Sequence, residues 1–170
     1  MRTLSLLVLS ALFILPLFAD QKTVDSDPQA DFSKYHTFAI RNGKITSKRP
    51  ELNSTIIQKQ IENDIRSQIR SKGFIEQEQR PDLIVNFHFG SANKREVETW
   101  PAGRFGWGRR RVVNLRTEGT LVVDLLDRDS RELVWRGIYV DDESNPSKLA
   151  KKLDDDVKKL FDKFPPGKKK

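Results

Sequence analysis

The segment Gly119–Gly137, GTLVVDLLDRDSRELVWRG, constrains the fold more than any other part of this 170-residue chain. Two runs with period-two alternation flank the polar stretch Asp127–Ser130, and this pattern is typical of a β-hairpin. Short polar side chains suit the connecting turn because they can hydrogen-bond the local backbone. The segment therefore predicts two antiparallel strands joined by a tight turn.

The first nineteen residues have the pattern of a secretion signal. Arg2 supplies a positive n-region, Leu4–Leu15 an apolar core, and Leu17–Ala19 a segment before the cleavage site. The apolar run is shorter than the roughly 20 residues of a spanning helix, so we favour a cleaved signal over an uncleaved anchor. We expect an exported protein, periplasmic or extracellular. Because the chain has no cysteine, we expect neither a lipid anchor after the signal nor disulfides.

Residues 20–166 are predicted to form one domain, followed by a basic tail at 167–170. One helix is predicted at Asn53–Lys72, where an isoleucine every fourth residue makes one apolar stripe, and Gly73 ends it. A second helix is predicted from Pro146, and Pro165 stops it. Its apolar stripe consists of Leu149, Leu153, Val157, Leu160, Phe161 and Phe164.

The remaining segments predict strands. They are Lys22–Asp25 as an edge strand, Phe32–Ile40, Phe74–Glu78, Asp82–Gly90, and Lys94–Trp100 paired with Arg110–Thr117. Asn42-Gly43 predicts a turn and Lys44–Leu52 a loop. Short connections between the late strands favour antiparallel pairing. We therefore predict an α+β fold, in which a mainly antiparallel twisted sheet carries two helices packed on one face.

A series of short motifs runs through the chain in a defined order. They are Asp31–Phe38, Ser71–Phe74, Pro81–Val85, Gly119–Asp127, Leu133–Gly137 and Phe164-Pro165. Together they resemble the bacterial envelope family called domain of unknown function 4136. The resemblance implies a compact α+β envelope domain. Many members are lipoproteins, and this chain departs from them by lacking the lipid-bearing cysteine. The family has no established catalytic motif, so the resemblance assigns no functional residues.

Residue types that support catalysis are sparse. The chain has no cysteine, no Gly-x-Ser-x-Gly elbow and two histidines, His36 and His88. A hydrolase using Asp124 with His88 is one hypothesis, but we favour His88 as a strand residue because catalysis needs convergent groups. We expect neither a cofactor nor a metal site, since zinc needs three or four ligands. Asp154–Asp156 is interpreted as a solvated helix face.

The segment Trp100–Arg111, WPAGRFGWGRRR, is the most suggestive of binding, and we call it the Arg/Trp loop. Aromatic rings can stack on flat ligands or sugars, and guanidinium groups can hold anions. The same residues suit a membrane interface. The alternative is a hairpin tip whose aromatic residues fold back on the helix-free face of the sheet. The candidate ligand-binding residues are Trp100, Arg104, Phe105, Trp107, Arg109, Arg110 and Arg111.

The chain carries 31 Lys and Arg against 24 Asp and Glu, a formal net charge of +7. A basic surface aids solubility and attracts anionic partners, which for an exported protein are envelope polymers rather than nucleic acid. The leading hypothesis is a non-catalytic exported domain that binds or scaffolds an envelope protein or an anionic envelope polymer. The alternatives are the hydrolase and a peripheral binder of anionic membrane or glycan through the Arg/Trp loop. The oligomeric state is left open.

Overall fold

The computed structural model describes residues 21–47, 49–101, 109–141 and 145–166, and for residues 92–101, 109–118 and 146 it describes the backbone alone. The predicted signal at 1–19 and the tail at 167–170 lie outside these ranges. The strands form one six-stranded sheet of order β1-β6-β5-β4-β2-β3. The elements are β1 (Gln21–Ser26), the 3-10 helix η1 (Phe32–Lys34), β2 (Thr37–Ser47), α1 (Thr55–Ser71), β3 (Ile75–Glu76), β4 (Leu83–Pro101), β5 (Arg109–Asp127), β6 (Leu133–Asp141) and α2 (Pro146–Phe161).

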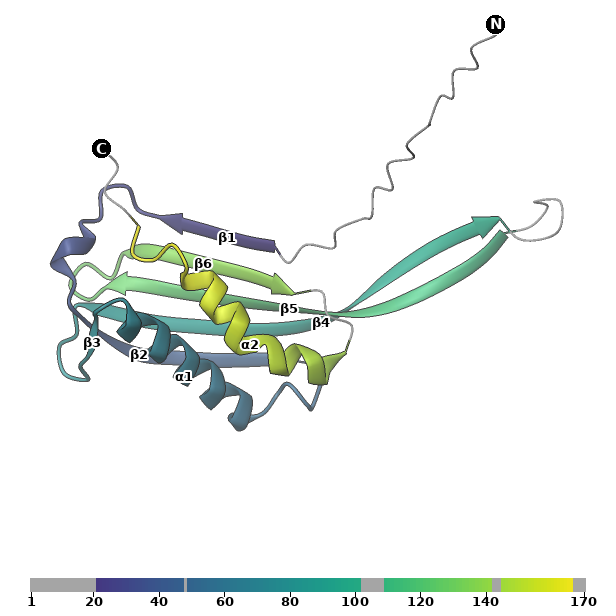
Figure 1. Cartoon of the computed structure of the whole chain (residues 1–170), viewed down its shortest axis with the longest axis horizontal. Coiled ribbons are helices and arrows are strands. Elements are labelled where there is room, and N and C mark those ends of the chain that lie inside the picture. The colour runs from purple at the N-terminus through teal and green to yellow at the C-terminus, as the bar shows by residue number, and fades with distance from the viewer. Residues whose placement is uncertain (1–20, 48, 102–108, 142–144, 167–170) are drawn as a thin grey trace, which may run out of the picture.

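The sheet is mixed and mostly antiparallel. β2 pairs in parallel with β3 and β4, and the other neighbouring strands run antiparallel. Both helices lie on the same face of the sheet (Figure 1). The predicted α+β fold with two helices on one face is therefore confirmed. Among the described residues, no helix has the length and apolarity needed to cross a membrane.

The predicted hairpin is the β5–β6 pair. Its register runs from Gly119 opposite Asp141 to Leu126 opposite Leu133. The Asp127 carboxylate accepts hydrogen bonds from the backbone N–H groups of Asp129 and Ser130, at 2.8 and 2.9 Å. The turn is thus held by the local side-chain-to-backbone bonds that its composition predicts.

The core lies between the sheet and the two helices. The isoleucine stripe of α1 is fully or nearly buried, and Ser54 caps this helix by accepting a bond from the Ile57 N–H. On α2, Phe161 stacks on Trp135 of β6 with ring centroids 5.1 Å apart. At Gly137 a Cβ atom would lie 2.6 Å from the Trp135 ring and 2.7 Å from Leu160. Glycine is therefore required for α2 to lie this close to β6.

The predicted turn at Asn42-Gly43 is wrong. β2 continues through both residues to Ser47 and pairs in parallel with β4, with a register shift between Ile40 and Asn42. Gly43 serves close packing instead, since a Cβ there would lie 2.4 Å from the Phe87 ring. The strand predicted at Phe32–Ile40 is shorter at its start, because Phe32–Lys34 forms η1.

β4 and β5 are longer than the rest of the sheet. They pair without interruption from Leu83 opposite Asp127 to Pro101 opposite Arg109. β2 follows β4 only to Ser91, and β6 follows β5 only to Gly119. In the described part of the chain, residues 92–101 and 109–118 therefore pair with each other alone. They leave the sheet as a two-stranded extension, called here the ribbon (Figure 1). The predicted pairing of Lys94–Trp100 with Arg110–Thr117 is confirmed.

Candidate functional site

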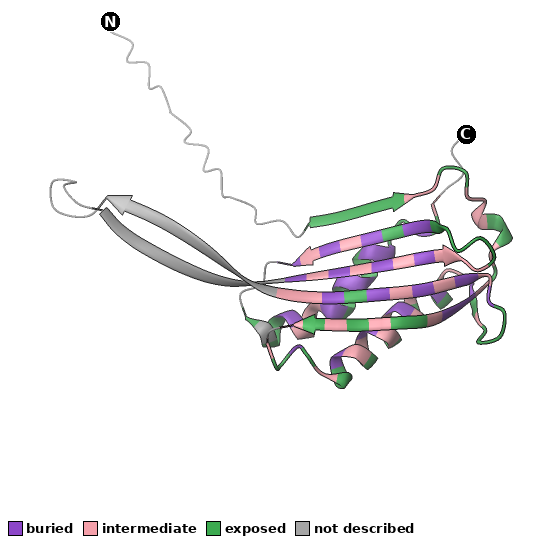
Figure 2. Ribbon diagram, turned by 180° about the vertical axis from the view of Figure 1, so that it is seen from behind, coloured by how far each residue is buried: buried purple, intermediate pink, exposed green. Residues whose placement is uncertain are grey.

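The two ends of the sheet differ. The ribbon leaves one end, and the β1–η1 loop, the β5–β6 turn and the C-terminal end of α2 gather at the other (Figure 1). Exposed residues, coloured green, gather on the loop and turn at that second end (Figure 2). The candidate site has one part at each end.

The ribbon end contains the residues that the sequence selects for binding. The register places the Trp100 backbone opposite Arg110, Thr99 opposite Arg111 and Pro101 opposite Arg109. The pairing of β4 with β5 thus places the backbone of Trp100 beside the backbone of Arg109, Arg110 and Arg111 at the end of the ribbon. The other candidate residues, Arg104, Phe105 and Trp107, lie outside the described residues.

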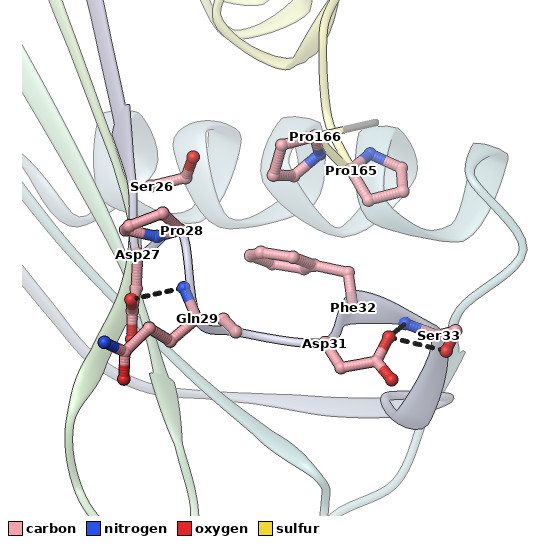
Figure 3. A pocket seen from close by; sticks show the side chains of 10 residues that line it. Ser26, Asp27, Pro28, Gln29, Asp31, Phe32, Ser33, Pro165 and Pro166 are labelled. Atoms are coloured by element: carbon pink, nitrogen blue, oxygen red, sulfur yellow. Dashed lines mark hydrogen bonds between the residues drawn. The ribbon is translucent and has the colours of Figure 1, made fainter. Parts of the chain in front are cut away.

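The opposite end has a cavity of about 580 Å³, which we call the Phe32 pocket. The β1–η1 loop forms one wall and Pro165-Pro166 the other, and the Phe32 side chain lies between them (Figure 3). The Phe32 ring also packs edge-on against Phe164, with centroids 5.9 Å apart. The pocket is therefore apolar in its middle, and its loop wall carries Asp27 and Asp31.

A second cavity, of about 470 Å³, adjoins the Phe32 pocket and shares the loop residues 27 and 29–31 with it. We call this cavity the acidic cleft. Its lining residues include six carboxylates and two cations, Lys34 and Arg128. The carboxylates belong to Asp27, Asp31, Asp82, Asp127, Asp129 and Glu132. The Tyr35 hydroxyl donates a hydrogen bond of 3.0 Å to Asp127 inside the cleft.

Hydrogen bonds keep two of these carboxylates ionised. The pKa of Asp127 is lowered, first by the N–H of Ser130 and then also by the Tyr35 hydroxyl and another amide. Burial by itself would raise the pKa of Asp82, but the N–H groups of His36 and Thr37 lower it overall. Burial and the bond to Asp127 raise the pKa of Tyr35 to about 12, so the phenol stays protonated. Asp82 and Asp127 therefore stay ionised at neutral pH.

Asp124 and His88, the residues of the hydrolase hypothesis, lie on the same helix-free face of the sheet, but each contacts a different side chain. Asp124 forms a two-pronged ion pair with Arg136, at 2.6 and 2.8 Å. His88 Nε2 lies 3.1 Å from the Thr46 hydroxyl. The Asp124 carboxylate is thus held by a guanidinium, and its register partner on β4 is Asn86 rather than His88.

One polar cluster lies where sequence reasoning predicted a solvated face. Asp154 and Asp155 are exposed, but Asp156 is 2% exposed and lies near Asp141, which is also buried. The prediction is wrong for Asp156. Asp156 follows Leu153 by three residues, which places it along the apolar stripe of α2, but its residue type indicates a surface acid and only the packing of α2 on β6 shows that it is buried.

Burial and the charge of Asp141 raise the pKa of Asp156 to about 7. Two lysines of α2 lie beside these acids. Lys152 Nζ lies 2.7 Å from the Asp141 carboxylate. Lys159 Nζ lies 3.9 Å from the Asp156 carboxylate and donates a hydrogen bond of 2.9 Å to the Tyr139 hydroxyl of β6. These cations limit the cost of burying two acids. The cluster joins α2 to the end of β6 beside the start of the ribbon.

Together the fold and its two ends define a small α+β domain with a projecting β-ribbon. The chain belongs to the family described as domain of unknown function (DUF4136), which matches residues 22–166. Residues 1–21 therefore precede the matched segment.

Several solved structures share the fold. A DUF4136 family protein from Bacteroides thetaiotaomicron is similar with a TM-score of 0.57 and 17% identity, over 86% of this chain and 96% of that one. A Helicobacter pylori protein described as a neuraminyllactose-binding hemagglutinin homolog gives 0.52 and 11%, over 85% and 94%. A PDZ domain protein from Parabacteroides distasonis gives 0.56 and 15%, over 88% of this chain but 36% of that longer chain. No curated protein sequence gives a significant match.

Proposed function

We propose that the protein is an exported, non-catalytic domain that binds or scaffolds a component of the bacterial envelope through the ribbon and the Arg/Trp loop. The observation that carries the proposal is the ribbon itself. Both of its outer edges are unpaired in the described part of the chain, and open strand edges are templates for contact with another molecule. An isolated two-stranded hairpin is only marginally stable in water, so a partner would stabilise the ribbon.

The residue types at the ribbon end favour an anionic or protein partner. Arginine forms two-pronged bonds with phosphate and carboxylate groups, and tryptophan stacks on rings. The proposed contact residues are Trp100, Arg104, Phe105, Trp107, Arg109, Arg110 and Arg111. The partner is then an envelope protein or an anionic envelope polymer. Export rests on the signal pattern of residues 1–19 and on the resemblance to an envelope family.

The test compares two variants that lose the same charge. In the first, Arg109, Arg110 and Arg111 are all changed to Ala. The control changes Lys151, Lys158 and Lys163 to Ala, and these are exposed lysines on or just after α2. Binding is measured by co-sedimentation with phosphatidylglycerol vesicles and with lipopolysaccharide, and by calorimetry with neuraminyllactose. We also measure capture of solubilised envelope proteins.

We expect the arginine variant to lose at least tenfold in affinity for the probe that binds, and the lysine variant to bind nearly as the parent does. A tenfold loss corresponds to about 1.4 kcal/mol, which is within reach of three charge-assisted contacts. Replacement of Trp107 and Arg110 by Ala should have a comparable effect. If both ribbon variants bind every probe and envelope fraction as the parent does, the ribbon is not the contact element.

A further inference from the structure

The two ends of the molecule are complementary in charge and in polarity. The ribbon residues 92–101 and 109–118 include six Lys and Arg against three Glu, a formal net charge of +3. The lining of the acidic cleft has the opposite sign, with six carboxylates against two cations. Beside the cleft, the Phe32 pocket offers an apolar surface between Phe32 and Pro165-Pro166 (Figure 3). A basic segment with an aromatic residue matches such a pocket, because the ring meets apolar walls and the cations meet the carboxylates.

This matching segment cannot come from the same copy. The ribbon leaves the sheet at the end remote from the β1–η1 loop, which lines the Phe32 pocket, and extends away from that loop (Figure 1). Leu83 of β4 lies at the pocket end and Ser91 at the ribbon end, so about nine strand residues, roughly 30 Å, separate the two. Each copy therefore has a ribbon at one end of the sheet and a pocket that could receive a ribbon at the other end.

We propose that the ribbon end of one copy, with Trp100 and Arg109–Arg111, docks into the Phe32 pocket and acidic cleft of a second copy. This inference rests on the proposed function, for which it names the partner as another molecule of the same protein. The ribbon projects by about ten residues per strand, roughly 33 Å. It can therefore reach into a neighbour whose pocket end lies beyond the ribbon end of the first copy.

The charges favour this head-to-tail arrangement over pairing of two ribbons. Two ribbons would bring together segments of the same sign, and like charges placed opposite each other are destabilising. Ribbon and cleft carry opposite signs, which steers the encounter and fixes its direction. A contact between two different surfaces of identical chains is heterologous, so it continues from copy to copy until it closes as a ring or extends as a chain.

The decisive experiment uses two complementary charge variants, one that reverses the charge of the ribbon and one that neutralises the cleft. The ribbon variant changes Arg109, Arg110 and Arg111 to Glu. The cleft variant changes Asp129 and Glu132 to Lys. Both of these cleft residues are exposed, whereas each of the other four carboxylates accepts a backbone hydrogen bond and helps to hold its loop. Far-UV circular dichroism and thermal melts verify that both variants are folded.

Sedimentation equilibrium of the purified proteins gives the mass at about 50 mM and about 1 M salt, up to about 0.5 mM protein, where contacts of micromolar to millimolar affinity are populated. For the parent we expect a weight-average mass at least twice that of the monomer at low salt, falling toward the monomer at high salt. The ribbon variant by itself should be monomeric, because its ribbon and its cleft are then both negative. The cleft variant by itself should associate less than the parent, because its cleft, with four carboxylates and four cations, no longer attracts the basic ribbon. An equimolar mixture of the two variants should form pairs with about twice the monomer mass, because the basic ribbon of the cleft variant meets the unchanged acidic cleft of the ribbon variant.

The outcomes separate this inference from the proposed function. A parent that stays monomeric under all these conditions overturns the head-to-tail contact. A cleft variant that associates as the parent does also overturns it, since the ribbons would then pair with each other. If the parent is monomeric while the ribbon variant loses binding to vesicles or lipopolysaccharide, the ribbon binds an anionic polymer and only the partner named here is wrong. If neither association nor probe binding changes in the ribbon variant, the proposed function fails as well.

Discussion

Replacement of Asp156 by Asn should stabilise the protein at pH 8 and have little effect at pH 4. Asp156 is 2% exposed, and its carboxyl lies between α2 and β6. Burial, followed by the charge of Asp141, raises the pKa of Asp156 from 3.8 to about 7, while Lys152, Lys159 and the Tyr139 hydroxyl act in the opposite direction. The folded protein therefore holds a proton on Asp156 at pH values where the unfolded chain has lost it.

The sign of the pH effect follows from proton linkage. Between about pH 4 and pH 7 the folded state binds more protons than the unfolded state, so the contribution of Asp156 to stability decreases as the pH rises. A difference of about three pKa units corresponds to a loss of at most about 4 kcal/mol above pH 7. Lys159 lies 3.9 Å away and can approach the ionised carboxylate, which reduces the loss. We therefore expect Asp156→Asn to increase the free energy of unfolding by about 2 to 4 kcal/mol more at pH 8 than at pH 4.

Urea unfolding, followed by helical circular dichroism at several pH values from 4 to 8, measures this difference directly. Asp155→Asn is the matched control, because Asp155 is exposed on the same helix and the variant loses the same charge. The difference in unfolding free energy between the Asp156 variant and the parent should grow with pH, whereas that of the control should stay nearly constant. A pH-independent difference for the Asp156 variant, or a larger destabilisation at pH 8 than at pH 4, would refute the reasoning.

Two further predictions concern packing and capping. Gly137→Ala should destabilise the fold by about 1 to 3 kcal/mol, because the added Cβ would lie 2.6 Å from the Trp135 ring. Gly90→Ala should be close to neutral in the same urea assay, because its nearest neighbour would be 3.6 Å away. Equal effects of the two glycine substitutions would argue against the close approach of α2. Ser54→Ala should cost about 1 kcal/mol, since α1 loses its N-cap, and an unchanged unfolding midpoint would show that the cap is unimportant.

Much of the architecture could be predicted because its signals are local. The isoleucine stripe, Gly73 after it, and the alternating runs around the Asp127 turn each lie within one short window of sequence. The pairing of Lys94–Trp100 with Arg110–Thr117 was predictable for the same reason, since the two runs flank one loop. The candidate residues Trp100 and Arg109–Arg111 were also selected from the sequence. The cavities at the opposite end were not, because residues distant in the chain, such as Phe32 and Pro165, form them together.

The amino-acid sequence by itself determined which segments become helices and strands, because periodicity and capping act over a few residues. Only the tertiary structure decided the role of residues whose local signal is ambiguous. Asn42-Gly43 reads locally as a turn, but parallel pairing with β4 and the Phe87 ring keep it in β2. Asp156 reads as a surface acid, but packing of α2 on β6 buries it. Folding likewise gathers the carboxylates of the acidic cleft from distant parts of the chain and places this cleft and the basic ribbon at opposite ends of one sheet (Figure 1).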